Sequence, residues 1–326
     1  MTLTGGVERQ FLVRWNGTAW TLVTPPLPVG TTESGLYGVT CASTASCWSV
    51  GRVKISGTWR RLLLRWNGTA WATATSPLPI GTTDSALFGV VCTATDNCWT
   101  VGRATASGVT RRMVLRWNGT VWSAVLTPAL PTGTTSSELY GVACASTASC
   151  WAVGKRLVNA NLTELPLVLR WNGSAWSNAT TPLPGDAIGG YLTGVTCAGP
   201  ADCWAVGLDN LYSGPRRSML RWNGTAWSIV NTTLPLGTSS SVLADVTCFA
   251  STSCWAVGTV LVSGSWRRLV QRWNGTAWSN VSTPLPVNTT ASRLSGIGCV
   301  TSTNCWTVGR TTDTGGNELR LVIHLT

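Results

Sequence analysis

The residues of this chain that could do chemistry are few, apart from its cysteines. The sequence holds 12 Cys, 12 acidic residues and a single histidine, His324. One histidine near the end of the chain leaves no nucleophile–His–acid set, and the acids are not paired at hydrolase-like positions in the repeats. We therefore expect neither an enzyme nor a cofactor or metal site.

The cysteines form six copies of the pattern C-x5-C-W, and none is left over. Facing positions of an antiparallel strand pair lie within disulfide range, and closing a seven-residue loop is worth about 2–2.5 kcal/mol in the chain-entropy model. Zinc ligands usually come closer together with partners nearby, so zinc is a weaker interpretation, and reduced structural cysteines are a third. We predict a disulfide in each repeat, joining Cys41 to Cys47, Cys92 to Cys98, Cys144 to Cys150, Cys197 to Cys203, Cys248 to Cys254 and Cys299 to Cys305. Paired cysteines would place the protein outside the reducing cytosol.

A second motif, R-W-N-G followed by a Trp three residues after the Gly, also occurs six times. Its copies begin 51 or 54 residues apart, at Arg14, Arg65, Arg116, Arg170, Arg221 and Arg272. A fixed period of this length predicts a propeller or another repeat array.

Each period contains four short segments with strand character, which in one repeat are 36–41, 47–51, 59–66 and 69–73. Asn-Gly between the last two predicts a hairpin with a type I′ turn, and Ser-Gly marks the turn before it. A long Pro-rich connection such as 26–35 then leads to the next repeat. A four-stranded meander followed by one long connection is the chain path of a propeller blade. A β-solenoid, the alternative, would have a shorter repeat without three tight hairpins.

The N-G-x-x-W hairpin resembles a variant of the Asp-box turn of bacterial BNR-type propellers, with Asn16 where Asp would be expected. The segment Cys203–Gly207 followed by L-R-W-N-G-T-A-W looks like the Trp-rich propeller repeats of bacterial secreted proteins. It is also broadly similar to kelch-like and tachylectin-type lectin propellers. The resemblance implies a propeller fold, whose members include lectins, adhesins, assembly factors and enzymes. The residues of a sialidase are not recognisable, so that activity is not carried over.

The strand count leaves one strand over. The chain opens with a strand of the third type, 7–15, and closes with another, 318–325, in which His324 and Leu325 take the places of the motif Arg and Trp. We therefore expect a single all-β domain over residues 1–326, a six-bladed β-propeller of four-stranded blades with one disulfide per blade and one surplus strand. A surplus edge strand could pair with a second copy and make a homo-oligomer.

Composition limits the partners. Charged residues make up 11% and hydrophobic residues 44%, which excludes a disordered chain or a coiled coil. No apolar run approaches the roughly 20 residues of a membrane helix, and the first residues lack the basic and apolar regions of a signal peptide. We expect either a mature form or another export route. The net charge of +11 allows an anionic polymer as partner, although Arg stacking on Trp explains many of these residues structurally. Nucleic acid is not favoured, because no basic run with interleaved aromatics occurs.

Differences between the repeats separate scaffold from candidate site. A Trp present in every repeat is most economically a packing residue, whereas the turn between the second and third strands varies. Six of the 11 N-x-S/T sequons lie in the Asn-Gly turns and are candidate glycosylation sites: Asn16, Asn67, Asn118, Asn172, Asn223 and Asn274. The candidate ligand-binding residues lie at the variable positions: Trp59, Trp266, Tyr212, Tyr37, Phe88, Tyr140, Arg60, Arg111 and Arg267.

These patterns favour a non-enzymatic, secreted or cell-surface propeller that binds carbohydrate or a cell-surface polymer. The alternative is a structural surface protein that assembles into arrays or filaments through head-to-tail or strand-exchange contacts.

Overall fold

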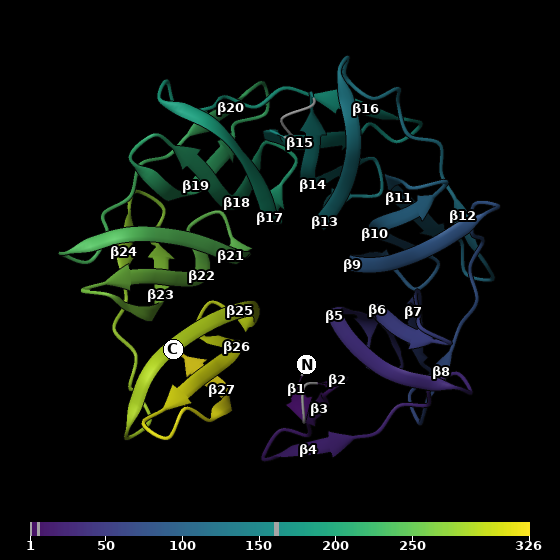
Figure 1. Ribbon diagram of the computed structural model, residues 1–326, viewed down its shortest axis with the longest axis horizontal. Coiled ribbons are helices and arrows are strands. Elements are labelled where there is room, and N and C mark those ends of the chain that lie inside the picture. Colours follow the sequence, from purple (N-terminus) through teal and green to yellow (C-terminus); the bar gives the residue numbers. More distant parts are fainter. Residues whose placement is uncertain (1, 5–6, 160–162) are drawn as a thin grey trace. The chain divides into compact units, whose positions relative to one another are not determined.

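The computed structural model describes residues 2–4, 7–159 and 163–326, and every regular element in these ranges is a β-strand. The chain divides into two compact units. Unit 1 comprises residues 1–152 and 171–177, and unit 2 comprises 153–170 and 178–326. The described strands form six antiparallel meanders, each the sheet of one propeller blade (Figure 1). The expected all-β, six-bladed β-propeller class is therefore confirmed.

Strands of one type have nearly the same length in every blade. First strands have 13 residues: β5 (Thr31–Ser43), β9 (Thr82–Ala94), β13 (Thr134–Ser146), β17 (Ala187–Gly199), β21 (Thr238–Ala250) and β25 (Thr289–Thr301). Second strands have ten: β6 (Ser46–Ile55), β10 (Asn97–Ala106), β14 (Ser149–Val158), β18 (Asp202–Leu211), β22 (Ser253–Val262) and β26 (Asn304–Asp313). Third strands are β7 (Thr58–Trp66), β11 (Val109–Trp117), β15 (Thr163–Trp171), β19 (Gly214–Trp222), β23 (Ser265–Trp273) and β27 (Glu318–Leu325). Fourth strands are the shortest: β8 (Trp71–Thr73), β12 (Trp122–Ala124), β16 (Trp176–Ala179), β20 (Trp227–Ile229) and β24 (Trp278–Asn280).

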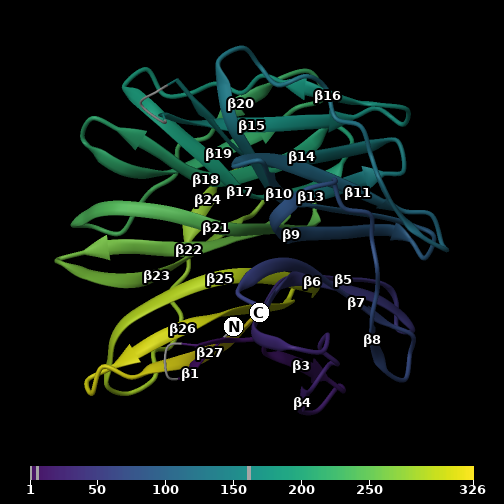
Figure 2. The same ribbon diagram turned by 45° about the vertical axis from the view of Figure 1, so that its right-hand side comes forward.

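The first strands begin earlier than the sequence pattern predicts. In the first repeat, β5 starts at Thr31, within the segment expected to be connection, because its Thr-rich start pairs with the end of β6. Figure 2 shows the equivalent strands β21, β22 and β23 of unit 2 lying side by side along their length. The longer strands extend each blade toward the variable second-to-third turns.

The Asn-Gly turns are hairpins, but they are not type I′ turns. The strand pairing on either side leaves four residues in the loop, and of the first two only Gly68 has a positive φ, of 99°. The Asn67 side-chain oxygen accepts hydrogen bonds from the backbone N–H groups of Thr69 and Ala70, at 2.9 Å each. The Asn therefore serves as an acceptor that closes a wider loop, and the expected turn type was wrong.

Two successive positive φ angles, the mark of a type I′ turn, occur instead at Ser-Gly. Ser56 and Gly57 have φ angles of 49° and 78° between β6 and β7. The same pair of signs recurs at Ser107–Gly108 and Ser263–Gly264. These tight two-residue turns match the twist of the flanking strands.

Each blade contains one disulfide, as predicted. Cys41 and Cys47 are paired in register at the end of β5 and the start of β6, with 4.0 Å between their Cα atoms. The other five expected pairs are formed with the same Cα separation. Six disulfides are consistent with an oxidising, extracellular environment.

The repeated Trp residues pack between successive blades. In unit 1 the Trp48 side chain is 1% exposed, and its ring lies edge-on to Trp117 and Trp122 of the next repeat, with centroids 4.8 and 5.0 Å apart. The guanidinium of Arg65 lies 5.6 Å from the Trp48 ring and 5.0 Å from the Trp117 ring. Such aromatic pairs contribute about 0.5–1.5 kcal/mol each beyond area burial, so the motif Arg and Trp residues have a structural role.

Unit 2 repeats this arrangement. Trp204 packs against Trp273 and Trp278 with centroids 5.0 and 5.1 Å apart, and the Arg221 guanidinium lies 5.1 Å from Trp204 and 5.2 Å from Trp273. In the last repeat His324 replaces the motif Arg and stacks on Trp306 at 4.5 Å, as its sequence position predicts.

A set of polar contacts made by the second residue of each Arg pair also joins successive blades, and we call this set the latch. The Arg217 backbone N–H donates to Ser241 Oγ in the next blade at 3.1 Å. The Arg217 guanidinium donates to the hydroxyl and carbonyl of Thr232 in the long connection. Burial lowers the pKa of Arg217 to about 10. Arg61 and Arg268 make the equivalent contacts. Among the described residues, Arg112 donates its backbone N–H to Ser137 Oγ, but its guanidinium donates to the Pro128 carbonyl alone.

The C-terminal strand β27 fills the third position of the last blade. It pairs with β26 so that His324 faces Trp306, and this sheet has three strands where the other blades have four. The other third-type segment is interrupted and gives β2 (Val7–Arg9) and β3 (Leu12–Trp15). It is the surplus segment.

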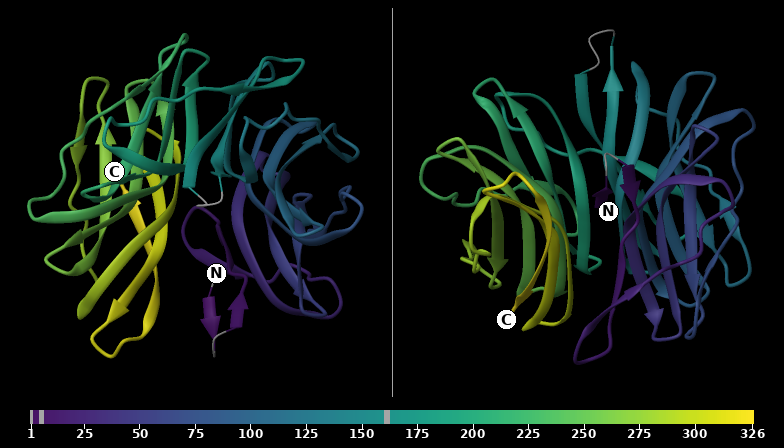
Figure 3. Two further views of the ribbon diagram at one scale, coloured as in Figure 1. Left: turned by 45° about the horizontal axis from the view of Figure 1, so that its top comes forward. Right: turned by 60° about the horizontal axis from the view of Figure 1, so that its bottom comes forward.

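The segments around the surplus strand form two separate hairpins in unit 1. β3 pairs with β4 (Trp20–Val23), and β2 pairs with β1 (Thr2–Thr4). Figure 3 shows β1 and β2 as two short antiparallel strands in purple. The β3–β4 hairpin docks on the first blade as a preceding blade would, because Gln10 N–H donates to Ser34 Oγ at 3.2 Å and Arg14 lies 4.9 Å from the Trp66 ring.

Over the described ranges, no helix is long and apolar enough to cross a membrane.

Candidate functional site

Three of the predicted site residues form one aromatic row in unit 1. Tyr37 on β5, Phe88 on β9 and Tyr140 on β13 lie side by side, with ring centroids 5.4 Å apart in both pairs. Tyr37 is 38% exposed, and the other two rings are half-buried. The aromatic row is a continuous, partly accessible surface built from three successive first strands.

A β-bulge presents the first two of these side chains, Tyr37 and Phe88. In the first repeat Leu36 pairs with Gly51 and Gly38 pairs with Val50, so Tyr37 between them has no facing residue. Phe88 lies at the same register shift in the second repeat. A bulge bends the strand and redirects the extra side chain. Gly51 permits the bend, because a Cβ there would lie 1.9 Å from the Gly35 carbonyl oxygen.

A cation and a carboxylate flank the first end of the row. The Arg52 guanidinium lies 3.9 Å from the centroid of Trp59, another predicted site residue, and its Nη2 forms a 2.7 Å ion pair with Glu8 Oε2. The other carboxylate oxygen of Glu8 accepts a 2.8 Å hydrogen bond from the Tyr37 hydroxyl. Cation, hydroxyl and two rings of the first repeat therefore meet a carboxylate of the N-terminal segment.

The second repeat places a similar group farther along the row. Arg103 lies 3.4 Å from a carboxylate oxygen of Asp84 and 3.6 Å from one of Glu138. Glu138 also accepts a 3.4 Å hydrogen bond from the Tyr140 hydroxyl. Both ends of the aromatic row thus carry an Arg–carboxylate–Tyr set.

The Tyr37 hydroxyl is held in its protonated form. Burial raises the pKa of Tyr37 well above its usual value, and the hydrogen bond to Glu8 raises it further. The hydroxyl is therefore a hydrogen-bond donor throughout the neutral range, suited to an acceptor oxygen.

The remaining predicted ligand-binding residues are not all part of this group. Trp266 and Tyr212 belong to unit 2, where Trp266 lies 5.6 Å from the Arg293 guanidinium and Tyr212 is 85% exposed. Arg60, Arg111 and Arg267 are the outward members of their Arg pairs. Arg111 donates to the Thr135 carbonyl at 2.8 Å, a contact that joins adjacent blades. Their ligand role stays a prediction.

Sequence reasoning missed five charged residues of the site: Glu8, Arg52, Asp84, Arg103 and Glu138. A signal for the two cations was present. The residue after C-W-x-V-G is Arg52, Arg103 and Lys155 in the three repeats that carry an aromatic after the first-strand Leu, although the sixth repeat has Arg310 there with Ser295 in place of the aromatic. Comparing these two positions of the repeats would have named Arg52 and Arg103 as candidates.

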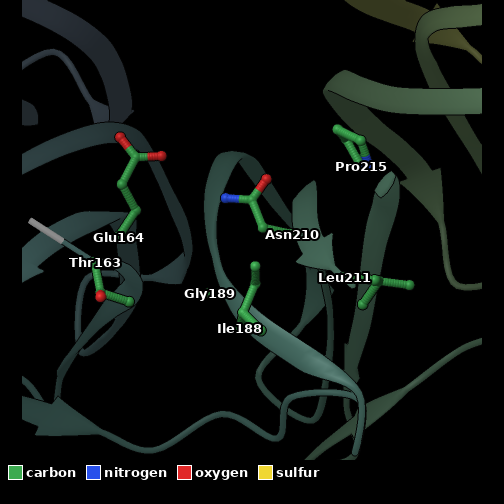
Figure 4. A pocket seen from close by; sticks show the side chains of 7 residues that line it. All are labelled: Thr163, Glu164, Ile188, Gly189, Asn210, Leu211 and Pro215. Carbon is green, nitrogen blue, oxygen red and sulfur yellow. The ribbon is translucent and has the colours of Figure 1, made fainter. Parts of the chain in front are cut away.

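A cleft of about 360 Å³ lies elsewhere, in unit 2 (Figure 4). Glu164 and Asn210 project into it above Ile188, and Glu164 forms a 2.6 Å ion pair with Lys155. Its lining residues are Thr163, Glu164, Ile188, Gly189, Asn210, Leu211 and Pro215. The cleft has no aromatic lining residue, so we place the candidate site at the aromatic row.

The cleft lies beside the one described Arg-pair position that has lost its latch. Pro166 stands where the other repeats have the inward Arg, and it has no N–H to donate. Gly190 correspondingly replaces the Ser whose hydroxyl accepts that N–H. Pro166 lacks the donor and Gly190 lacks the acceptor of the same hydrogen bond, so the two changes compensate for each other.

The six Asn-Gly asparagines are all exposed, and each uses its side-chain oxygen within its own turn. Their glycosylation stays a prediction. In the part of the chain that the structure covers, no group of three His, Cys, Asp or Glu side chains could hold a metal ion.

No protein-family model matches the chain, and no curated protein matches it. Solved structures do match it. A lectin from Burkholderia pseudomallei has a TM-score of 0.59 at 12% identity, covering 94% of this chain and 86% of that one. An ulvan lyase of a new polysaccharide lyase family has 0.59 at 10% identity, with 90% and 78% covered. A lectin in complex with alpha-methyl fucoside has 0.51 at 11%, with 90% and 96% covered. At these identities the similarity is one of fold.

Proposed function

We propose that this protein is a non-enzymatic, extracellular or cell-surface propeller that binds carbohydrate at the aromatic row of unit 1. The observation that carries the proposal is the contact of Tyr37, Phe88 and Tyr140, with an Arg–carboxylate set at each end. Aromatic faces stack on the C–H surfaces of sugar rings, and a few placed polar groups orient a ligand on an apolar surface. Lectins that share this fold are compatible with the proposal.

Binding without catalysis fits the residues available. The single histidine, His324, lies in unit 2, stacked on Trp306 and 3.0 Å from the Asn304 side-chain oxygen. It occupies the position of the motif Arg and therefore has a structural role. The fold similarity to a lyase does not supply a catalytic set to this chain.

The test is binding to a glycan array, followed by calorimetry with any saccharide that scores. Phe88→Ala removes the central ring of the row, and we expect it to weaken binding by at least about tenfold. Phe249→Ala, which removes an aromatic side chain that is 52% exposed in unit 2, is the matched control and should bind as the wild type does. An array without hits, or a Phe88→Ala variant that binds normally, would refute the proposal.

A second candidate function is self-assembly through the β3–β4 hairpin, with a second copy of the chain as partner. The observation that favours it is the solvent exposure of the large apolar side chains on this hairpin. Trp15 and Trp20 are each 38% exposed and Leu22 is 69% exposed, whereas the equivalent Trp117 and Trp122 are 5% and 4% exposed. We expect sedimentation of the wild type to show oligomers and a Leu22→Ser variant to show fewer. A wild type that sediments only as a monomer would remove this candidate.

A further inference from the structure

The carboxylate of Glu8 lies buried at the first end of the aromatic row. Glu8 is 4% exposed, and its two oxygens bond the Arg52 guanidinium at 2.7 Å and the Tyr37 hydroxyl at 2.8 Å. A Cβ on Gly35 would lie 2.2 Å from Glu8 Oε1. The carboxylate therefore fills a space that exists because Gly35 has no side chain.

The groups around this space are arranged for a carboxylate. The Arg52 guanidinium lies over the Trp59 ring, with its Cζ 3.9 Å from the centroid, and this contact restricts the positions that the guanidinium can take. Among the described residues the Arg52 Nε–H has no hydrogen-bond partner, so Glu8 uses only part of the donor fork. A planar guanidinium prefers to bind a carboxylate through two parallel hydrogen bonds. The site can thus bind a better-placed carboxylate than the one it holds.

The strand that carries Glu8 is short and has few attachments. β2 has three residues. Apart from the Glu8 carboxylate, its contacts to β5 include a 3.4 Å bond from the Glu8 N–H to Glu33 and a 3.0 Å bond from Arg9 to the Thr32 carbonyl. Short strands with few buried contacts open locally at low free-energy cost.

In the second repeat the carboxylates that pair with the Arg belong to strands of complete blades. Arg103 is neutralised by Asp84 and Glu138, which lie within the 13-residue strands β9 and β13 of complete blades. Those carboxylates cannot leave without disrupting the blades. The described carboxylate partner of Arg52, in contrast, is Glu8, which lies on the short strand β2 outside the four-stranded blades.

We propose that Arg52 and Tyr37 form a binding site for the carboxylate of an acidic saccharide, and that Glu8 occupies this site until the ligand displaces it. A uronate residue fits, because its carboxylate would replace that of Glu8 while its ring and its neighbours lie on the aromatic row. The net charge of +11 favours the approach of such a polyanion. This inference rests on the proposed function and names the ligand class of the same site.

The experiment is calorimetry with a galacturonate oligomer and a neutral galactose oligomer of the same length, at low salt. Glu8→Ala removes the internal occupant, so the galacturonate oligomer should bind about tenfold more tightly than to the wild type. Glu318→Ala is the matched control, because Glu318 pairs with Arg310 at 2.9 Å in unit 2 and its removal changes the net charge by the same amount without touching Glu8, Arg52 or Tyr37. It should leave the affinity unchanged.

Two further variants keep the test decisive. Glu8→Gln retains the shape of the side chain and should give the same direction of change if Glu8→Ala unfolds β2. Adding Arg52→Met to Glu8→Ala should abolish the gain. The inference is overturned if Glu8→Ala and Glu8→Gln bind the galacturonate oligomer no better than Glu318→Ala, or if the neutral oligomer gains equally.

The outcomes separate this inference from the proposed function. If neutral saccharides bind every variant alike through Phe88, carbohydrate binding stands and the acidic ligand class is wrong. If no saccharide, neutral or acidic, binds the wild type or any Glu8 variant, both proposals fail.

Discussion

Asp209 is a carboxylate in the core of the fourth blade, and its removal should stabilise the protein. The residue is 5% exposed on β18, and its Oδ1 has no hydrogen-bond partner in the described ranges. The equivalent positions of the first and fifth repeats are Val53 and Val260, each 1% exposed. Burial raises the pKa of Asp209 from 3.8 to about 6, against a smaller opposing effect of its hydrogen bond with Ser218.

The sign of the pH dependence follows from this rise. Because the folded state holds the Asp209 proton more tightly than the unfolded chain, its contribution to stability is fully present below about pH 3.8. The contribution is lost as the pH rises through about 6. A rise of this size corresponds to at most about 3 kcal/mol above pH 7.

Asp209→Asn keeps the shape of the side chain and removes the ionisation. We expect the variant to be more stable than the wild type by about 2–3 kcal/mol at pH 7.5, with a melting temperature roughly 3–5 °C higher. The difference should shrink toward zero at pH 4. Thermal denaturation monitored by circular dichroism across pH 4–8 measures both quantities, and taking differences from the wild type cancels other titrating groups.

A double variant provides the control. Ser218 is 3% exposed and stands where the first repeat has Leu62, so Asp209 and Ser218 replace the buried pair Val53 and Leu62. Replacing a buried polar pair by apolar residues of similar volume is often stabilising. Asp209→Val with Ser218→Leu should therefore also be more stable at pH 7.5. A destabilised Asp209→Asn at pH 7.5, or a difference that is flat between pH 4 and 8, would show the reasoning to be wrong.

Three further predictions concern the contacts that join blades and strands. Trp99→Leu should lower the free energy of unfolding by about 3 kcal/mol, because the ring is fully buried against Trp171 and Trp176. Urea denaturation measures this change, and a loss below about 1 kcal/mol would contradict the packing role. Arg217→Met should cost about 1–2 kcal/mol by removing the guanidinium bonds to Thr232, whereas Met at the exposed neighbour Arg216 should cost almost nothing; equal effects would refute a stabilising role of these bonds. Intact-mass measurement should find 12 hydrogens fewer than in the reduced chain, and titration of 12 free thiols would exclude the disulfides.

The blades and disulfides could be predicted because their signals are local and repeated. Alternating residues, turn residues and a Cys pair at the ends of adjacent strands lie within one period of the chain. The turn type was wrong for a local reason as well. The Asn side chain of each N-G-T/S turn accepts backbone N–H groups, which favours a four-residue loop over the two-residue turn.

The site could be predicted only in part. Its aromatics stand out because they break the repeat, and Tyr37, Phe88 and Tyr140 do meet. Their charged partners could not be assigned, because Glu8 meets Arg52 from 44 residues away through the docking of one segment on another. Local sequence patterns do not indicate which residues so far apart in the chain come into contact.

What the sequence determines by itself is the repeating unit: six periods, the strand order within each, the pairing of every cysteine, and the positions that differ between repeats. These depend on neighbours within about 50 residues, where side-chain alternation and turn chemistry act directly. The tertiary structure alone decides which of two segments with the same local pattern takes the third-strand position of the last blade. Residues 7–15 and 318–325 both read as third strands, but β27 pairs with β26 while the earlier segment divides at Gln10 and Phe11 into β2 and β3. That division places Glu8 on Arg52, because a strand without a second-strand partner is free to dock its side chains on the neighbouring blade.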